Sequence, residues 1–173
     1  SATVNPISDF DAILPCHFAY NQINDLHSKG SIQGINGFYF PNNTVSKGEF
    51  LKIALRDAGL VTSSCAQTVS PFSGIETSSL NQELRCAYYY GLLKYENASF
   101  NPNQPISRAQ AMVWLISIRQ TPTIASNTNY FSDVPVSSWS PAINTAYQKQ
   151  WIQGFQGLFY PNNTLTRAEA AKV

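Results

Sequence analysis

Residues 149–170 read KQWIQGFQGLFYPNNTLTRAEA, and residues 29–50 read KGSIQGINGFYFPNNTVSKGEF. Aligned at an offset of 120 residues, the two stretches share Ile-Gln-Gly, a second glycine, Pro-Asn-Asn-Thr and a glutamate. A more divergent copy, GLLKYENASFNPNQPISRAQA, lies between them at residues 91–111. Three copies at a period of about 60 residues indicate a protein built from tandem repeats.

Each copy predicts one helix before the shared loop. Apolar residues precede the loop at the spacing of one face of a helix. These positions are Ala19, Ile23, Leu26 and His27 in the first copy, Leu80, Leu84, Ala87 and Tyr88 in the second, and Ala142, Ile143, Ala146 and Tyr147 in the third.

A second helix is predicted after the loop, because each copy continues with the pattern S/T-x-x-E/Q. This pattern is a capping box, in which the hydroxyl accepts from the third backbone amide of the helix and the acid or amide side chain returns to the first residue. The pairs are Ser46 with Glu49, Ser107 with Gln110, and Thr166 with Glu169.

The chain therefore divides into three units, 1–60, 61–120 and 121–173, of which the second is divergent. Stretches rich in Ser and Thr at 61–74 and 121–129 predict linkers between the units. The last helix of the third unit is expected to be about two turns shorter than its counterpart in the first. Since a unit of about 60 residues buries little apolar surface alone, we expect all three units to share one core.

Composition excludes several classes of protein. The 173 residues carry 11 Lys and Arg against 10 Asp and Glu, so the chain has no excess of basic residues for nucleic acid or a membrane surface. Hydrophobic residues reach 43%, which argues against disorder. No apolar run approaches the ~18 residues of a membrane span, so no membrane insertion is expected.

Catalysis is not expected either. Cys16, Cys65 and Cys86 have no metal-ligand spacing, and they are open to two readings: a Cys65–Cys86 disulfide, or three small buried apolar side chains. Cys16 and His17 are adjacent, which points their side chains apart, and His27 is expected in the core. The sequence has no phosphate loop or metal motif, so we expect no enzyme, cofactor or metal.

The third copy resembles the S-layer homology repeat. This family has a Phe-x-Asp-Val start, a helix with Trp and Ala-Ile, a glycine-containing loop and a Thr-Arg-Ala-Glu helix start. The resemblance covers nearly the whole chain as three copies, although the first has Lys47-Gly48 in place of Arg-Ala and the second has Tyr95 at the loop glycine. The matching residues are Phe131, Asp133, Val134, Trp139, Ala142, Ile143, Gly154 and Thr166 to Glu169.

The resemblance implies an all-α, pseudo-threefold bundle of three helix–loop–helix repeats. It further implies a non-covalent anchor at the bacterial cell surface. Its partner would be an acidic, often pyruvylated, secondary cell-wall polysaccharide or a peptidoglycan-linked glycan, bound in grooves between repeats. The cation of the Thr-Arg-Ala-Glu stretch would contact the acidic sugar.

Elementary electrostatics points to the same cations. A basic residue follows each helix cap, where the helix dipole makes a positive charge unfavourable. A cation, a hydroxyl and free backbone amides at a helix start can form an anion site. Lys47 is expected to contribute least to binding, because an ammonium acts only as a point charge. The alternative is that each cation pairs with a carboxylate of a neighbouring repeat. The candidate sets are Ser46 with Lys47, Ser107 with Arg108, and Thr166 with Arg167.

Four further residues are candidates for glycan contact. Trp139 could line a groove, and Asp133 belongs to the resemblance. Gly34 and Gly154 could allow close approach of the backbone to a sugar, although we favour the explanation that they supply turns with positive φ.

The main prediction is thus an extracellular anchoring module that binds an acidic wall glycan. The alternative is a structural subunit whose repeats assemble with other copies of the same chain into an S-layer-like lattice or filament.

Overall fold

The protein is described by a computed structural model that covers residues 17–36, 38–73, 78–96, 99–124 and 129–173. Within these ranges the fold is helical and has isolated β-bridges but no strand. The helices are α1 (Tyr20–Ser28), α2 (Lys47–Asp57), α3 (Ser63–Ala66), α4 (Asn81–Tyr89), α5 (Arg108–Ile118), α6 (Ser140–Gln148) and α7 (Arg167–Lys172).

The two helices predicted in each copy are confirmed. Helices α1, α4 and α6 cover the apolar stripes before the loops, while α2, α5 and α7 begin directly after Ser46, Ser107 and Thr166. The short helix α3 lies within the predicted linker 61–74 and was not predicted.

The capping boxes differ from expectation in one copy. Ser46 and Thr166 accept from the third amide, and their glutamates return to the backbone of the cap. Ser107 accepts from the amide of Gln110 at 3.2 Å, but Gln110 makes no return bond. The box predicted for the second copy is therefore only half formed.

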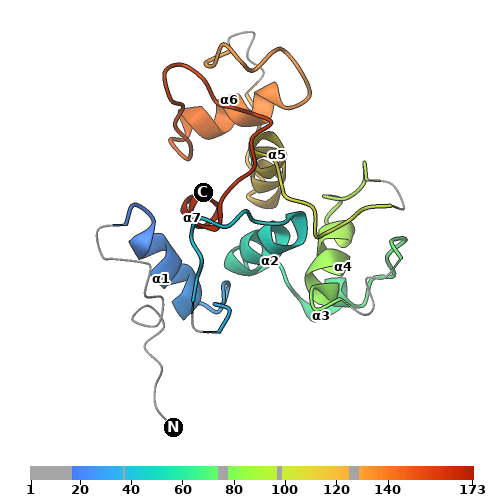
Figure 1. Ribbon diagram of the computed structural model, residues 1–173. Helices are drawn as coiled ribbons and strands as arrows, with labels where there is room; N and C mark the ends of the chain where they lie inside the picture. The colour runs from blue at the N-terminus through green and yellow to red at the C-terminus, as the bar shows by residue number, and fades with distance from the viewer. Residues whose placement is uncertain (1–16, 37, 74–77, 97–98, 125–128) are drawn as a thin grey trace.

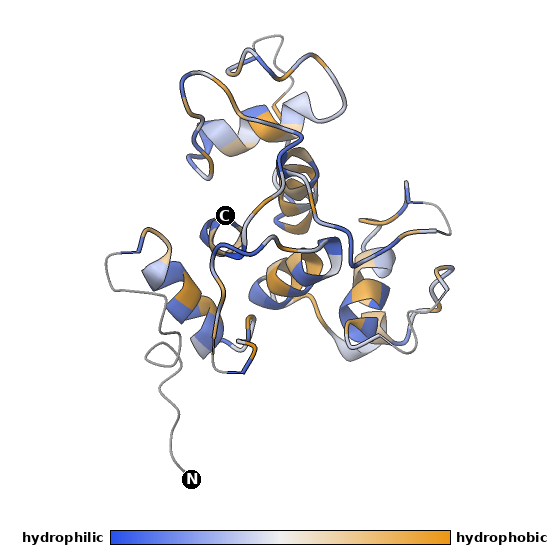
Figure 2. Cartoon of the chain, in the orientation of Figure 1, coloured by the Kyte–Doolittle hydropathy of each residue, from blue (hydrophilic) through white to orange (hydrophobic). Residues whose placement is uncertain are grey.

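The central helices come from three different copies. Helices α2, α5 and α7 lie in the middle of the molecule, and α1, α4 and α6 lie around them (Figure 1). Helix α4 packs on α2, α6 on α5, and α1 on α7. Each outer helix thus packs on a central helix of another copy, which explains why the copies share one hydrophobic cluster. Apolar residues concentrate on α2 and α5 at the centre (Figure 2).

A closed ring of backbone hydrogen bonds joins the three copies just before the central helices. The Val45 amide donates to the Leu165 carbonyl (2.9 Å), the Leu165 amide to the Ile106 carbonyl (3.2 Å), and the Ile106 amide to the Val45 carbonyl (3.1 Å). All three side chains are buried. The ring holds the starts of the three central helices together.

The cysteines and histidines follow the expectations only in part. Cys65 of α3 and Cys86 of α4 form a disulfide, which decides between the two readings for this pair. Cys16 lies outside the described residues. His27 is only half-buried, so the prediction of a core histidine was wrong.

Candidate functional site

The backbone amides at the starts of the central helices are occupied. In α7 the Arg167 amide donates to Asn43 O (2.8 Å) and the Ala168 amide to Pro41 O (3.0 Å), both in the turn of the first copy. The third amide, of Glu169, donates to the Thr166 hydroxyl. Equivalent bonds run from Lys47 to Gln104, Gly48 to Pro102, Arg108 to Asn163 and Ala109 to Pro161. An anion site built on free amides here was therefore a wrong expectation.

Arg167 is also held by the first copy. Its Nε donates to Tyr39 O (2.8 Å), Nη1 to Glu49 Oε1 (3.1 Å) and Nη2 to Gln33 O (3.1 Å). The guanidinium lies 4.6 Å from the Tyr39 ring centroid, and the residue is 7% exposed. Burial raises the pKa of Tyr39 to about 12, although the nearby positive charge of Arg167 opposes the shift.

Arg108 repeats this arrangement against the third copy. Its Nε donates to Phe159 O (2.9 Å), Nη1 pairs with Glu169 (3.2 Å), and the guanidinium lies 4.8 Å from the Phe159 ring centroid. Lys47 lies 3.9 Å from Glu96 and 5.6 Å from the Phe100 ring centroid. The alternative in which each cation pairs with a carboxylate of a neighbouring copy is confirmed for all three.

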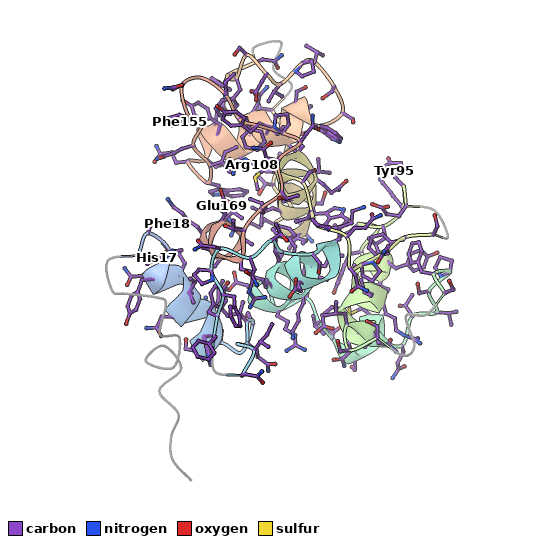
Figure 3. All side chains as sticks on the ribbon, viewed as in Figure 1. His17, Phe18, Tyr95, Arg108, Phe155 and Glu169 are labelled. Atoms are coloured by element: carbon purple, nitrogen blue, oxygen red, sulfur yellow. A yellow bond between two sulfur atoms is a disulfide. The ribbon has the colours of Figure 1, made fainter. Side chains whose placement is uncertain are left out.

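Two grooves open beside the arginine pairs, and we call them groove A and groove B. Groove A has a volume of about 190 Å³ and adjoins Arg167, and groove B has a volume of about 300 Å³ and adjoins Arg108. Figure 3 shows Arg108, Glu169 and Phe18 around groove B. Six lining positions correspond at the offset of 120 residues. Ser31 and Trp151 differ in type, and the other five have the same or a similar residue: Ile32 and Ile152, Gln33 and Gln153, Glu49 and Glu169, Lys52 and Lys172, and Ile53 and Val173.

Each groove contains a lysine that no carboxylate neutralises among the described residues. Lys52 is half-buried in groove A. Lys172 is exposed in groove B, with its Nζ 5.6 Å from the ring centroid of Phe18. Sequence reasoning missed both, although a signal was present: each follows the box glutamate by three residues, and the second copy has Val113 there.

The remaining candidates for glycan contact lie in different parts of the structure. Gly34 lines groove A, but Trp139, 38% exposed at the N-cap of α6, lines neither groove. The Asp133 carboxylate accepts from the amides of Phe159 (2.8 Å) and Tyr160 (2.6 Å), so it holds the loop in place.

The two loop glycines do not supply positive φ. Among the described glycines that conformation belongs to Gly30, Gly59, Gly91 and Gly157. Gly154 instead leaves room for the ring of Phe131, since a Cβ would lie 2.3 Å from Phe131 Cε1. The reading of Gly34 and Gly154 as positive-φ turn residues was therefore wrong.

The junction of the first two copies lacks this set of charges. Gln110 replaces the glutamate and Val113 replaces the lysine. Tyr95, at the position of Gly34, is 89% exposed (Figure 3), and Lys94 Nζ lies 4.7 Å from its ring centroid.

Comparison with known proteins agrees with the second and third copies. The family model described as the S-layer homology domain matches residues 88–112 and 130–171. These two stretches are similar to the S-layer homology domain, a module that anchors proteins at the cell wall. No curated protein matches the chain.

Two further features are absent from the described residues. No helix there is long and apolar enough to cross a membrane. No cluster of His, Cys, Asp and Glu suited to a metal ion occurs in that part of the chain.

Proposed function

We propose that the chain holds a protein non-covalently at the bacterial cell surface by binding an acidic, pyruvylated wall glycan in grooves A and B. The three units 1–60, 61–120 and 121–173 act as repeats of one pseudo-threefold domain. The ring through Val45, Ile106 and Leu165 and the cyclic packing of outer on central helices support this symmetry.

One observation carries the proposal: groove A and groove B share five side-chain positions, and each includes a lysine that forms no ion pair with the described residues. A carboxylate is the ligand group that a partly enclosed ammonium binds well, because charge-assisted hydrogen bonds are about twice as strong as neutral ones. The box glutamate beside each lysine accepts sugar hydroxyls. Lys52 and Lys172 are thus the primary contacts to the acidic substituent.

The arginines support the grooves rather than act as free charges. The Arg167 side chain is buried, and three hydrogen bonds and the ring of Tyr39 hold its guanidinium in place. Arg108 is less enclosed, and its Nη2 has no hydrogen-bond partner among the described residues, so it can donate to a ligand in groove B. Ser46, Ser107 and Thr166 position the helices, and Lys47 makes no contribution to either groove.

The test is retention by purified pyruvylated wall polysaccharide, measured as affinity by calorimetry. A Lys52→Met, Lys172→Met double variant should lose at least about tenfold in affinity, the factor for one charge-assisted bond. Its melting temperature should stay at the wild-type value, because neither lysine forms an ion pair. Lys149→Met, which removes an exposed lysine outside the grooves, is the matched control. Unchanged affinity of the double variant refutes the proposed ligand contacts.

One observation favours the alternative, a subunit of an S-layer-like lattice. Ile35 and Phe155 occupy equivalent loop positions and are 53% and 65% exposed. Exposed apolar loops of this kind can pair between copies of the chain. Concentration-dependent association that an Ile35→Ser, Phe155→Ser variant abolishes would support this function, and a monomer at all concentrations would reject it.

A further inference from the structure

The third copy has a second depression next to groove B, which we call the side depression. Its volume is about 640 Å³, and Tyr130, Tyr147, Gln148, Gln150 and Gln153 contribute to its walls. Gln150, Ile152 and Gln153 also line groove B, so the two spaces adjoin at these residues. No Asp, Glu, Lys or Arg lines the side depression.

The walls of the side depression combine aromatic faces with amides. The rings of Tyr130 and Tyr147 lie 4.9 Å apart at an interplanar angle of 38°, and both residues are 39% exposed. The Gln148 amide donates to the Tyr130 hydroxyl. Aromatic rings are large apolar surfaces with a polar edge, and amides both donate and accept. This combination suits an uncharged ligand with one apolar face and several hydroxyls.

Gln150 adopts a backbone conformation that its residue type disfavours. It follows the C-cap of α6 with φ of 60°, at the position where the first two copies have Gly30 (72°) and Gly91 (74°). Glycine is the usual residue there, because a Cβ is disfavoured in the left-handed region. The third copy therefore keeps a glutamine at a cost to stability, and its side chain lies at the junction of groove B and the side depression.

We propose that the side depression is a subsite for an uncharged sugar residue next to the acidic sugar of the same glycan. This inference rests on the proposed function, since it assigns the acidic sugar to groove B. In the first copy His27, Ser28 and Gly30 replace Tyr147, Gln148 and Gln150, and only the amide of Gln153 is kept, as Gln33. The glycan thus extends from groove B across Gln150 toward Tyr147, and groove A has no such extension.

The test compares Gln150→Gly with Gln120→Gly. Gln120 has φ of 48° after the C-cap of α5 and lies in neither groove nor the side depression, so it is a matched control for the backbone. Both variants should raise the melting temperature. The probes are pyruvylated wall polysaccharide and the same polymer after mild acid removes its pyruvate. Gln150→Gly should weaken binding of both polymers about fivefold, by the same factor, while Gln120→Gly should change neither affinity.

The outcomes separate the subsite from the proposed function. If Gln150→Gly binds both polymers like wild type, or weakens only the pyruvylated one, the neutral subsite is refuted while the acidic site stands. If wild type binds both polymers equally and Gln150→Gly weakens both, the subsite is supported and the acidic ligand is refuted. If wild type binds neither polymer, both proposals fail.

Discussion

The first and third copies meet around Arg167 and Glu49, whereas the first and second copies meet around Lys47 and Glu96. The backbone hydrogen bonds are equivalent at the two junctions: the amides of Arg167 and Lys47 each donate to a turn carbonyl of the facing copy at 2.8 Å. The side chains differ: Glu49 and Lys52 lie beside the arginine in groove A at the first junction, whereas Gln110 and Val113 occupy the corresponding positions at the second. One backbone framework therefore carries two kinds of junction.

In place of the groove residues, the second copy contributes a disulfide and a buried ion-pair partner that stabilise the fold. The disulfide joins α3 to α4, and Arg56 of α2 pairs with Glu83 of α4, which is 1% exposed. The backbone hydrogen bonds of a junction do not depend on which side chains lie beside them. One copy can therefore lose the charged residues of the groove and keep the fold. The comparison predicts that changes at the disulfide and at the Arg56–Glu83 pair affect stability and spare binding, as the first two variants test.

The largest effect is expected for Cys65→Ala with Cys86→Ala. The disulfide closes a loop between residues 21 positions apart, and its loss should lower the free energy of unfolding by about 3.5 kcal/mol. Urea unfolding measures this change. Binding of wall polymer by the folded variant should stay at the wild-type level, and a loss of binding without unfolding would contradict the division of roles.

Arg56→Ala should come next. The Arg56 guanidinium contacts Glu83 Oε1 through Nε (2.7 Å) and Nη2 (2.5 Å), and its removal leaves a carboxylate buried without its counter-charge. We expect the free energy of unfolding to fall by about 3 kcal/mol. Lys29→Ala, which breaks only exposed pairs with Asp25 and Asp57, is the control and should have no measurable effect. Equal losses from both variants would show that burial of the pair is unimportant.

Tyr39 makes the groove A junction sensitive to alkali. Its raised pKa of about 12 means that the unfolded chain loses the phenolic proton near pH 10 while the folded protein keeps it. The stabilisation is complete below pH 10 and is lost as the pH rises toward 12, by about 2 kcal/mol.

Tyr39→Phe tests this, since Phe159 already occupies the equivalent position in groove B. Unfolding at pH 9 and pH 11.5 should show a smaller alkaline loss for the variant. At pH 9 the variant should be about 1 kcal/mol less stable, because the hydroxyl donates to Arg167 O. An alkaline loss as large as that of wild type would assign the effect to other groups.

The smallest effect is expected for Gln110→Glu, which gives the second copy the glutamate of the other two. A completed capping box should raise the free energy of unfolding by about 0.5 kcal/mol. Glu49→Gln is the reverse change and should lower it, since it weakens the return bond to Ser46 and removes the negative charge that pairs with Arg167. Thermal melts of the two variants that shift in the same direction would show that the junctions are not equivalent.

The sequence was sufficient for features that depend on nearby residues. The helix starts after Ser46, Ser107 and Thr166 were predictable because a capping box is complete within four residues. The outer helices were predictable from their apolar spacing. Helix α3 was not, since its four residues are polar or small and resemble a linker.

Features that depend on distant residues were predicted incompletely. The positions of Arg108 and Arg167 drew attention correctly, but their hydrogen bonds end on carbonyl groups of another copy, which leave no pattern in the sequence. For the same reason, the sequence does not predict the backbone hydrogen bonds of the central ring. The lysines of the grooves were missed because a repeated lysine on a helix is usually a solvated residue, and only the geometry places Lys52 and Lys172 in grooves.

The ring through Val45, Ile106 and Leu165 has a consequence for the order of events during synthesis. Val45 and Leu165 are 120 positions apart, and α1 packs on α7 near the other end of the chain. Neither contact can form until Leu165 and the residues after it have left the ribosome. Pairings this distant in sequence slow folding. The apolar surfaces of the first copy that pack on the third copy therefore remain uncovered until the third copy has been synthesised.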